Sequence, residues 1–141
     1  MSRPQALLSI ATLGVLLALA CVATAATSTS SSATARSGGL TVTLTATPAR
    51  VTRGSTVRLR LTALERSARG AFGDRLSYGD GTASPPTAVP QFCIAGTPPP
   101  ASRTWRFSHR YHAAGTYHLT ATVFVNCTSD HATTLVTVRV K

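Results

Sequence analysis

Apolar and polar residues alternate along several segments from residue 40 onward, which is the period of strands buried on one face. From Leu40 to Ala46, apolar residues occupy every second position and threonines lie between them. No stretch shows the spacing of an amphipathic helix, so we predict an all-β fold, an antiparallel β-sandwich of about seven short strands. The predicted strands cover residues 40–46, 57–63, 76–78, 104–107, 119–125 and 133–140, with a short edge strand at Val89–Ile94.

A tight corner is predicted just before the strand at 119–125. His109, Tyr111, Gly115 and Tyr117 follow the spacing His-x-Tyr-x-x-x-Gly-x-Tyr. We expect the chain to reverse at Gly115, because glycine adopts a positive φ without steric cost. A tyrosine that enters a strand after such a turn can bury its ring and return a hydrogen bond to the corner.

A second turn signal follows the predicted strand at 76–78. The segment Leu76–Thr82 reads LSYGDGT, and it resembles the Trp-Asp-Phe-Gly-Asp-Gly-Thr signature of the polycystic kidney disease (PKD) domain family. The corner spacing matches the second signature of that family. The resemblance covers residues 40–141 and implies an immunoglobulin-like β-sandwich that makes non-catalytic protein–protein or protein–carbohydrate contacts outside the cell. It assigns structural roles to Leu76, Tyr78, Gly79, Asp80, Gly81, His109, Tyr111, Gly115 and Tyr117.

Two departures from the family pattern concern the first signature. Leu76 stands where the family has tryptophan, and we expect Trp105 to supply the missing core volume from a neighbouring strand. Ser77 replaces an acidic residue, which weakens the case for a cation at this turn.

Residues 1–25 have the composition of a secretory signal peptide. Arg3 is followed by an uncharged apolar run from Ala6 to Ala20. This run is shorter than the ~20 residues that span a bilayer, so we interpret it as a cleaved signal rather than a membrane anchor. The sequence therefore predicts export, to the medium or to the cell surface.

The mature N-terminus has two interpretations. Ala23-Thr24-Ala25 fits an ordinary signal peptidase, whereas the segment Leu17–Cys21 resembles a loose lipobox that would make Cys21 a lipidated N-terminus. Residues 26–39 are rich in serine and threonine and contain no apolar side chain larger than alanine. Such a segment does not repay the entropy of ordering, and we predict a disordered tether here.

Cys93 and Cys127 remain in the chain after either cleavage. Two cysteines in an exported domain are typical of a disulfide rather than of a reactive pair. A loop of this size would gain about 3–4 kcal/mol of stability from the bond in the chain-entropy model. The alternative is two unrelated free thiols.

No grouping of residues predicts catalysis, a metal site or a cofactor. His112, His118 and His131 are scattered, and His109 is expected to hydrogen-bond locally at the corner. Glu65 falls in a predicted connection and the aspartates in predicted turns, where their carboxylates accept backbone hydrogen bonds. The expectation is a protein that is not an enzyme.

Positive charge is the distinctive surface feature. The formal net charge is +10, and all but one of the 14 basic residues are arginine. An arginine-rich face attracts carboxylate- or phosphate-bearing polymers in a salt-dependent way. The candidate contacts are Arg58, Arg60, Arg103, Arg106 and Arg110.

Export makes an extracellular protein, a carbohydrate or an anionic cell-wall polymer a nearer partner than nucleic acid. We expect contact with the membrane only through a lipid on Cys21. Two alternatives stay open: arginine only solubilises the chain, or the protein is a lipid-anchored structural or adhesion protein that serves as a spacer.

Overall fold

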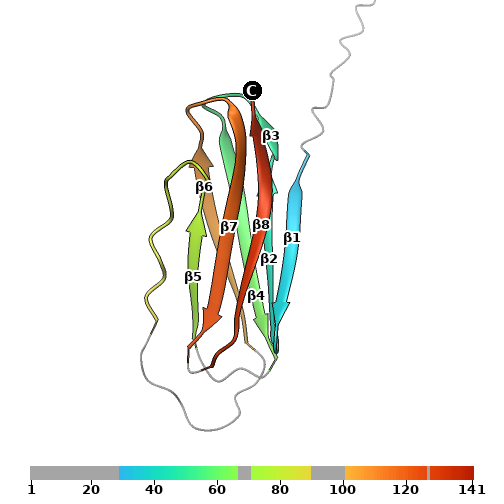
Figure 1. Cartoon of the computed structure of the whole chain (residues 1–141), viewed down its shortest axis with the longest axis vertical. Coiled ribbons are helices and arrows are strands. Elements are labelled where there is room, and N and C mark those ends of the chain that lie inside the picture. The colour runs from blue at the N-terminus through green and yellow to red at the C-terminus, as the bar shows by residue number, and fades with distance from the viewer. Residues whose placement is uncertain (1–28, 67–70, 90–100, 127) are drawn as a thin grey trace, which may run out of the picture.

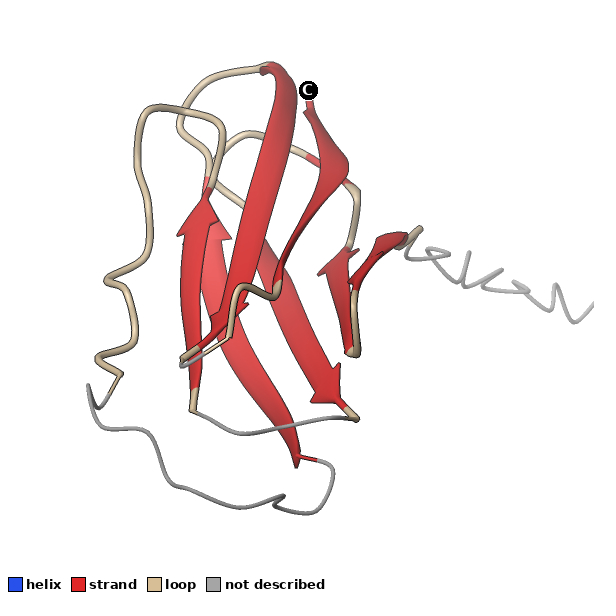
Figure 2. Ribbon diagram, turned by 60° about the horizontal axis from the view of Figure 1, so that its bottom comes forward, coloured by secondary structure: helices blue, strands red, loops and turns tan. Residues whose placement is uncertain are grey.

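Two four-stranded sheets pack face to face and form a sandwich (Figures 1 and 2). The computed structural model describes residues 29–66, 71–89, 101–126 and 128–141. Sheet A has the strand order β1-β2-β4-β6 and sheet B the order β3-β8-β7-β5. The strands are β1 (Ser31–Ser37), β2 (Leu40–Thr47), β3 (Arg50–Val51), β4 (Thr56–Glu65), β5 (Phe72–Ser77), β6 (Ala101–Arg110), β7 (Gly115–Val125) and β8 (His131–Val140).

Neighbouring strands run antiparallel, except for the short parallel pair of β3 and β8. The predicted all-β sandwich is therefore confirmed. The predicted strands fall on longer strands of the structure, except that β5 begins at Phe72 and ends at Ser77, which leaves Tyr78 of the predicted strand at 76–78 outside it. The predicted edge strand at Val89–Ile94 lies outside the described residues except for Val89, which is not part of a strand.

The core lies between the two inner faces, where the alternating apolar side chains meet. Leu44 of β2 stands opposite Leu61 of β4, and both side chains are fully buried. On sheet B, Leu119 of β7 stands opposite Val136 of β8 in the same way. Burial of each such side chain contributes about 1.5–3 kcal/mol, so the alternating pattern accounts for most of the driving force.

The predicted tether is wrong for Ser31–Ser37, because these residues form β1. They pair with β2 along their whole length through a tight turn at Gly38, whose φ is +55°. Ala33 and Ala35 pack against the core, and the hydroxyl of Ser32 lies 2.9 Å from that of Thr45. Backbone pairing and small side chains suffice to order an edge strand that carries no large apolar residue.

The segment after β5 covers the open side of the sandwich between β5 and β6 (Figure 1). The ring of Phe124 and the side chain of Val89 lie so close to Gly73 that a Cβ atom there would clash with both. Trp105 Nε1 donates a hydrogen bond to Thr87 Oγ1 at 3.1 Å, which ties the segment to β6.

The indole of Trp105 meets the ring of Phe72 edge-on, with centroids 6.3 Å apart. Phe72 and Leu76 both lie on the buried face of β5. The tryptophan expected to supply core volume near Leu76 is thus buried against the start of the same strand.

Several predictions fall on residues outside those described: the signal peptide at 1–25, lipidation of Cys21, and the disulfide between Cys93 and Cys127. They stay predictions. Among the described residues, no helix is long and apolar enough to span a membrane.

Candidate functional site

The two signature segments meet at one end of the sandwich, through Asp80 and His109. His109 Nε2 lies 2.6 Å from Asp80 Oδ2. The other carboxylate oxygen, Oδ1, accepts hydrogen bonds from the backbone nitrogen of Thr82 at 3.0 Å and from its hydroxyl at 2.6 Å. The expected local hydrogen bond of His109 is wrong, since its partner Asp80 belongs to the turn after β5.

Two glycines with a positive φ allow this turn to form, and neither of them is Gly115, the glycine of the corner motif. Gly79 and Gly81 have φ values of +81° and +89°. A Cβ atom on Gly79 would also lie 2.6 Å from the carbonyl oxygen of His118. Gly115, expected to have a positive φ, instead begins β7 without one; the ring of Tyr117 lies 3.6 Å from where its Cβ would be.

Four aromatic rings stack in sequence at the same corner. Tyr78 and His109 stack with centroids 4.0 Å apart, His109 meets Tyr111 edge-on at 4.7 Å, and Tyr111 stacks on Tyr117 at 4.2 Å. Tyr111 Oη donates to the buried carbonyl of Tyr78 at 2.9 Å. Tyr117 Oη donates to the carbonyl of Ala113 at 2.8 Å, which is the return contact of a tyrosine corner.

Electrostatics at the corner follow from these contacts. Burial alone would raise the pKa of Asp80, but hydrogen bonds from Thr82 and His109 outweigh it and lower the pKa to about 2. Burial and the nearby charge of Asp80 raise the pKa values of Tyr78 and Tyr111. The carboxylate is thus held ionised and the phenols protonated.

Two buried carboxylates were missed by the sequence analysis. Glu65 is the last residue of β4 rather than part of a connection, and Asp74 lies in β5 rather than in a turn. Both side chains are buried, and neither oxygen of Asp74 has a hydrogen-bond partner in the described part of the chain. The alternation of the strands could have revealed them, because residues two apart share a face. Glu65 lies two residues after the buried Ala63 in β4, and Asp74 lies midway between the buried Phe72 and Leu76 in β5.

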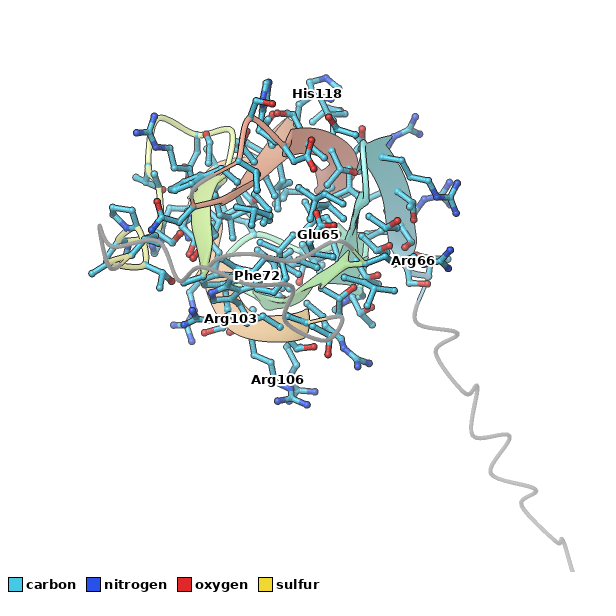
Figure 3. The ribbon with its side chains drawn as sticks, turned by 90° about the horizontal axis from the view of Figure 1, so that it is seen from below. Glu65, Arg66, Phe72, Arg103, Arg106 and His118 are labelled. Atoms are coloured by element: carbon cyan, nitrogen blue, oxygen red, sulfur yellow. The ribbon has the colours of Figure 1, made fainter. Side chains whose placement is uncertain are left out.

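No group of three or more histidine, cysteine, aspartate or glutamate side chains in the described ranges could hold a metal ion. The exposed outer face of sheet A carries different chemistry. Arg58 and Arg60 project outward from β4, and Arg106 and Arg110 project outward from β6. Figure 3 shows Arg106 pointing away from the sandwich. We call this surface, with Arg58, Arg60, Arg106 and Arg110, the arginine face.

Strand register brings these side chains together. Arg60 stands directly opposite Arg106, so their Cβ atoms lie roughly 5 Å apart. One row further along the strands Arg58 stands opposite Ser108, and in the next row Arg110 stands opposite Thr56. Like charges directly opposite on a sheet repel each other, and a partner of opposite charge relieves that cost.

Arg103 does not belong to the arginine face. It shares its position parity with Trp105, and its guanidinium carbon lies 5.1 Å from the centre of the indole ring. Arg103 Nη1 also donates to the carbonyl oxygen of Phe72 at 3.4 Å. This residue bridges β6 and β5, so of the candidate contacts Arg103 does not share a surface with Arg106 and Arg110.

Hydroxyl groups, and no carboxylates, accompany the arginines. A shallow groove of about 600 Å³ on this face is lined by Thr45, Thr47, Arg58, Arg60, Arg106 and Ser108, together with Leu59 and Phe107. The chain has only four acidic residues. Glu65 and Asp74 are buried, Asp80 lies in the signature turn, and Asp130 lies in the connection before β8.

Among the described residues, the large apolar side chains exposed to solvent are Leu64 and Leu135, and the exposed aromatic rings are those of His112, His118 and His131, none of which lies on β4 or β6. Neutral sugars and unpaired bases bind proteins largely by stacking on such rings. The arginine face therefore offers charge and hydrogen-bond donors, and its one lining ring, Phe107, is partly buried rather than a fully exposed stacking platform.

Comparisons with known proteins agree with the fold. A family model described as the PKD domain matches residues 25–138, a range that includes β1. No curated protein matches the sequence. A solved structure that is similar is the solution NMR structure of the CARDB domain of a Pyrococcus furiosus protein. The two share 19% identity over 72% of this chain and 94% of that chain, with a TM-score of 0.54, a likeness of fold alone.

Proposed function

Because the chain belongs to the PKD domain family, whose members are typically non-catalytic interaction modules of extracellular and surface proteins, we propose that it binds anionic polymers outside the cell through the arginine face. In this proposal the signature corner serves as the scaffold, because its polar groups hydrogen-bond to one another rather than to a ligand. The binding chemistry lies on sheet A.

The observation that carries this proposal is the placement of Arg60 opposite Arg106 on a face without a carboxylate. The two guanidinium groups have no carboxylate on their face of the sheet, so their mutual repulsion disfavours the free protein. A polymer with several negative charges turns this repulsion into attraction at several points at once. The arrangement supports a multivalent ligand better than a single small anion.

The kind of polymer follows from the rest of the surface and from the predicted export. The arginine face offers no fully exposed ring for a neutral glycan or a base to stack on, since Phe107 is partly buried. A signal peptide at 1–25 would deliver the domain to the cell wall or matrix, where acidic polymers are accessible. We therefore favour an acidic cell-wall polymer over nucleic acid or a neutral carbohydrate.

Attachment to the cell is a separate matter from binding. A lipid on Cys21 would make the domain a surface lipoprotein with a spacer role, whereas cleavage after Ala25 would release it. Mass spectrometry of the mature N-terminus distinguishes these: diacylglycerol on Cys21 supports the first, and a chain that starts at Ala26 supports the second.

Retention on a heparin column under a salt gradient tests the proposed function. The double variant Arg60→Gln/Arg106→Gln should elute at clearly lower salt than the unmodified protein. The matched control is Arg50→Gln/Arg139→Gln, which removes an exposed arginine pair aligned across β3 and β8 of sheet B. If both variants lose retention equally, only the net charge matters and the arginine face is not the site.

A further inference from the structure

We propose that the ligand of the arginine face is a phosphodiester-linked polyol chain, a polymer with three carbon atoms between successive phosphates, which lies along β4 and β6. This inference rests on the proposed function and specifies its ligand. It comes from the spacing of the charges along the strands rather than from their number.

The arginines occupy three consecutive rows of the sheet. Arg60 and Arg106 form the first row, Arg58 the second and Arg110 the third, each row two residues further along the strands. Residues two apart on a strand are about 6.7 Å apart and point to the same side. The face therefore repeats its positive charge about every 6.7 Å over three rows.

A phosphodiester chain with three-carbon spacers matches this repeat. Two residues of extended peptide contain six backbone bonds, and one such phosphate-to-phosphate unit also contains six bonds between tetrahedral atoms. Six such bonds span a similar length in an extended peptide and in an extended polyol phosphate. Successive phosphates can therefore contact successive rows of arginines without strain in the protein or the polymer. In a polyuronate the charges sit on rigid sugar rings, and their spacing cannot adjust to the rows.

Hydroxyl groups complete each row as phosphate donors. Ser108 stands opposite Arg58, and Thr56 stands opposite Arg110. On the β2 side, Thr45 stands beside Arg60. A phosphate has more acceptor sites than a carboxylate, and it can accept from a guanidinium and a hydroxyl in the same row.

The backbone of single-stranded nucleic acid has the same six-bond repeat. Proteins that bind it without sequence preference place aromatic rings beside the charged groove, and base stacking contributes about 1–3 kcal/mol per base. The exposed rings of the described surface, His112, His118 and His131, lie away from β4 and β6, and Phe107 in the groove is partly buried. A bare polyol phosphate therefore fits this face better, and an oligonucleotide serves as a comparison ligand.

Isothermal titration calorimetry of the mature full-length chain tests the inference. The ligands are synthetic glycerol phosphate oligomers from dimer to hexamer, oligogalacturonates of the same charge, and oligothymidylate. We expect affinity to rise at least about tenfold from the dimer to the trimer and then to level off, because the face has three rows. Three phosphate contacts predict a slope of log K against log salt of about −2.

The variant Arg58→Gln/Arg60→Gln/Arg106→Gln should lose about tenfold or more in affinity for the glycerol phosphate tetramer. The control Arg50→Gln/Arg75→Gln/Arg139→Gln removes the same charge from sheet B and should change affinity less than about threefold. Thermal unfolding of both variants checks that the fold is retained. Substitution of the same three face residues by lysine separates charge from the forked geometry of arginine.

Each result decides between the ligands. If oligogalacturonate binds as tightly as glycerol phosphate and through the same arginines, the polyol phosphate is wrong while the anion-binding function stands. If oligothymidylate binds more tightly than glycerol phosphate, the ligand is nucleic acid. If no ligand responds to the face variant more than to the control, the proposed function itself is wrong.

Discussion

His109 and Asp80 lie 29 positions apart in sequence, and their side chains meet with Nε2 and Oδ2 2.6 Å apart. This contact links β6 of sheet A to the turn that follows β5 of sheet B. One residue of each family signature is involved, which gives a physical reason why the two motifs occur together in one domain.

A double-mutant cycle measures the strength of this link. Asp80→Asn keeps an oxygen that accepts from Thr82 but weakens the contact with His109, and His109→Gln removes the ring. We expect a coupling free energy of about 1 kcal/mol in urea unfolding, the range of a charge-assisted hydrogen bond that is partly exposed. Strictly additive effects would show that the contact contributes nothing to stability.

The low pKa of Asp80 predicts a specific acid sensitivity. The pKa falls from an ordinary value of 3.8 to about 2 in the folded protein, so the ionised form stabilises the fold above pH 3.8. This contribution is lost as the pH falls through about 2. The free energy of unfolding, measured from pH 5 to pH 2, should decline more steeply for the unmodified protein than for Asp80→Asn. Parallel declines would contradict the assignment, and added salt should reduce the difference because the group is partly exposed.

Two glycine substitutions of the same size should differ sharply. Gly79→Ala forces a positive φ on alanine and drives its Cβ into the backbone of His118, so we expect a loss of more than about 2 kcal/mol. Gly115→Ala introduces a Cβ at ordinary contact distance from Tyr117 and should change stability by less than about 0.5 kcal/mol. Thermal melts of both variants suffice. Equal destabilisation would restore the expectation that the chain needs its glycine at 115.

The two corner tyrosines should also differ when their hydroxyl groups are removed. Tyr111→Phe leaves the buried carbonyl of Tyr78 without its donor, at a cost of about 1–3 kcal/mol. Tyr117→Phe frees a carbonyl that water can reach, and a loss of about 0.5–1 kcal/mol is expected. Urea unfolding ranks the two, and the reverse order would mean that Tyr117 holds the corner.

Most strands could be predicted because their alternating pattern records which face is buried. β1 could not, since Ser31–Ser37 carries no large apolar side chain and its order depends on pairing with β2. The sequence places both Gly79 and Gly115 near turns, and nothing in either motif shows which of the two has a positive φ. Which one takes the left-handed conformation depends on how closely another strand approaches.

The candidate site was predictable in composition and not in arrangement. Alternation placed Arg58 and Arg60 on one outer face, and the same parity would have separated Arg103 from Arg106. The alignment of Arg60 with Arg106 depends on the register of β4 against β6, which no pattern within either strand encodes. For the same reason, the meeting of Asp80 with His109 could not be read from two motifs considered separately.

The arginine face contains no carboxylate and no histidine, and this has a consequence for how the protein responds to its surroundings. Guanidinium groups keep their charge throughout the range of pH that cells and soils present. Any loosening of the complex by acid must then originate in the partner: a carboxylate polymer is neutralised near pH 4 and would detach, whereas a phosphodiester remains ionised and would stay attached. Binding that persists below pH 4 would therefore indicate a phosphodiester polymer as the ligand rather than a carboxylate polymer.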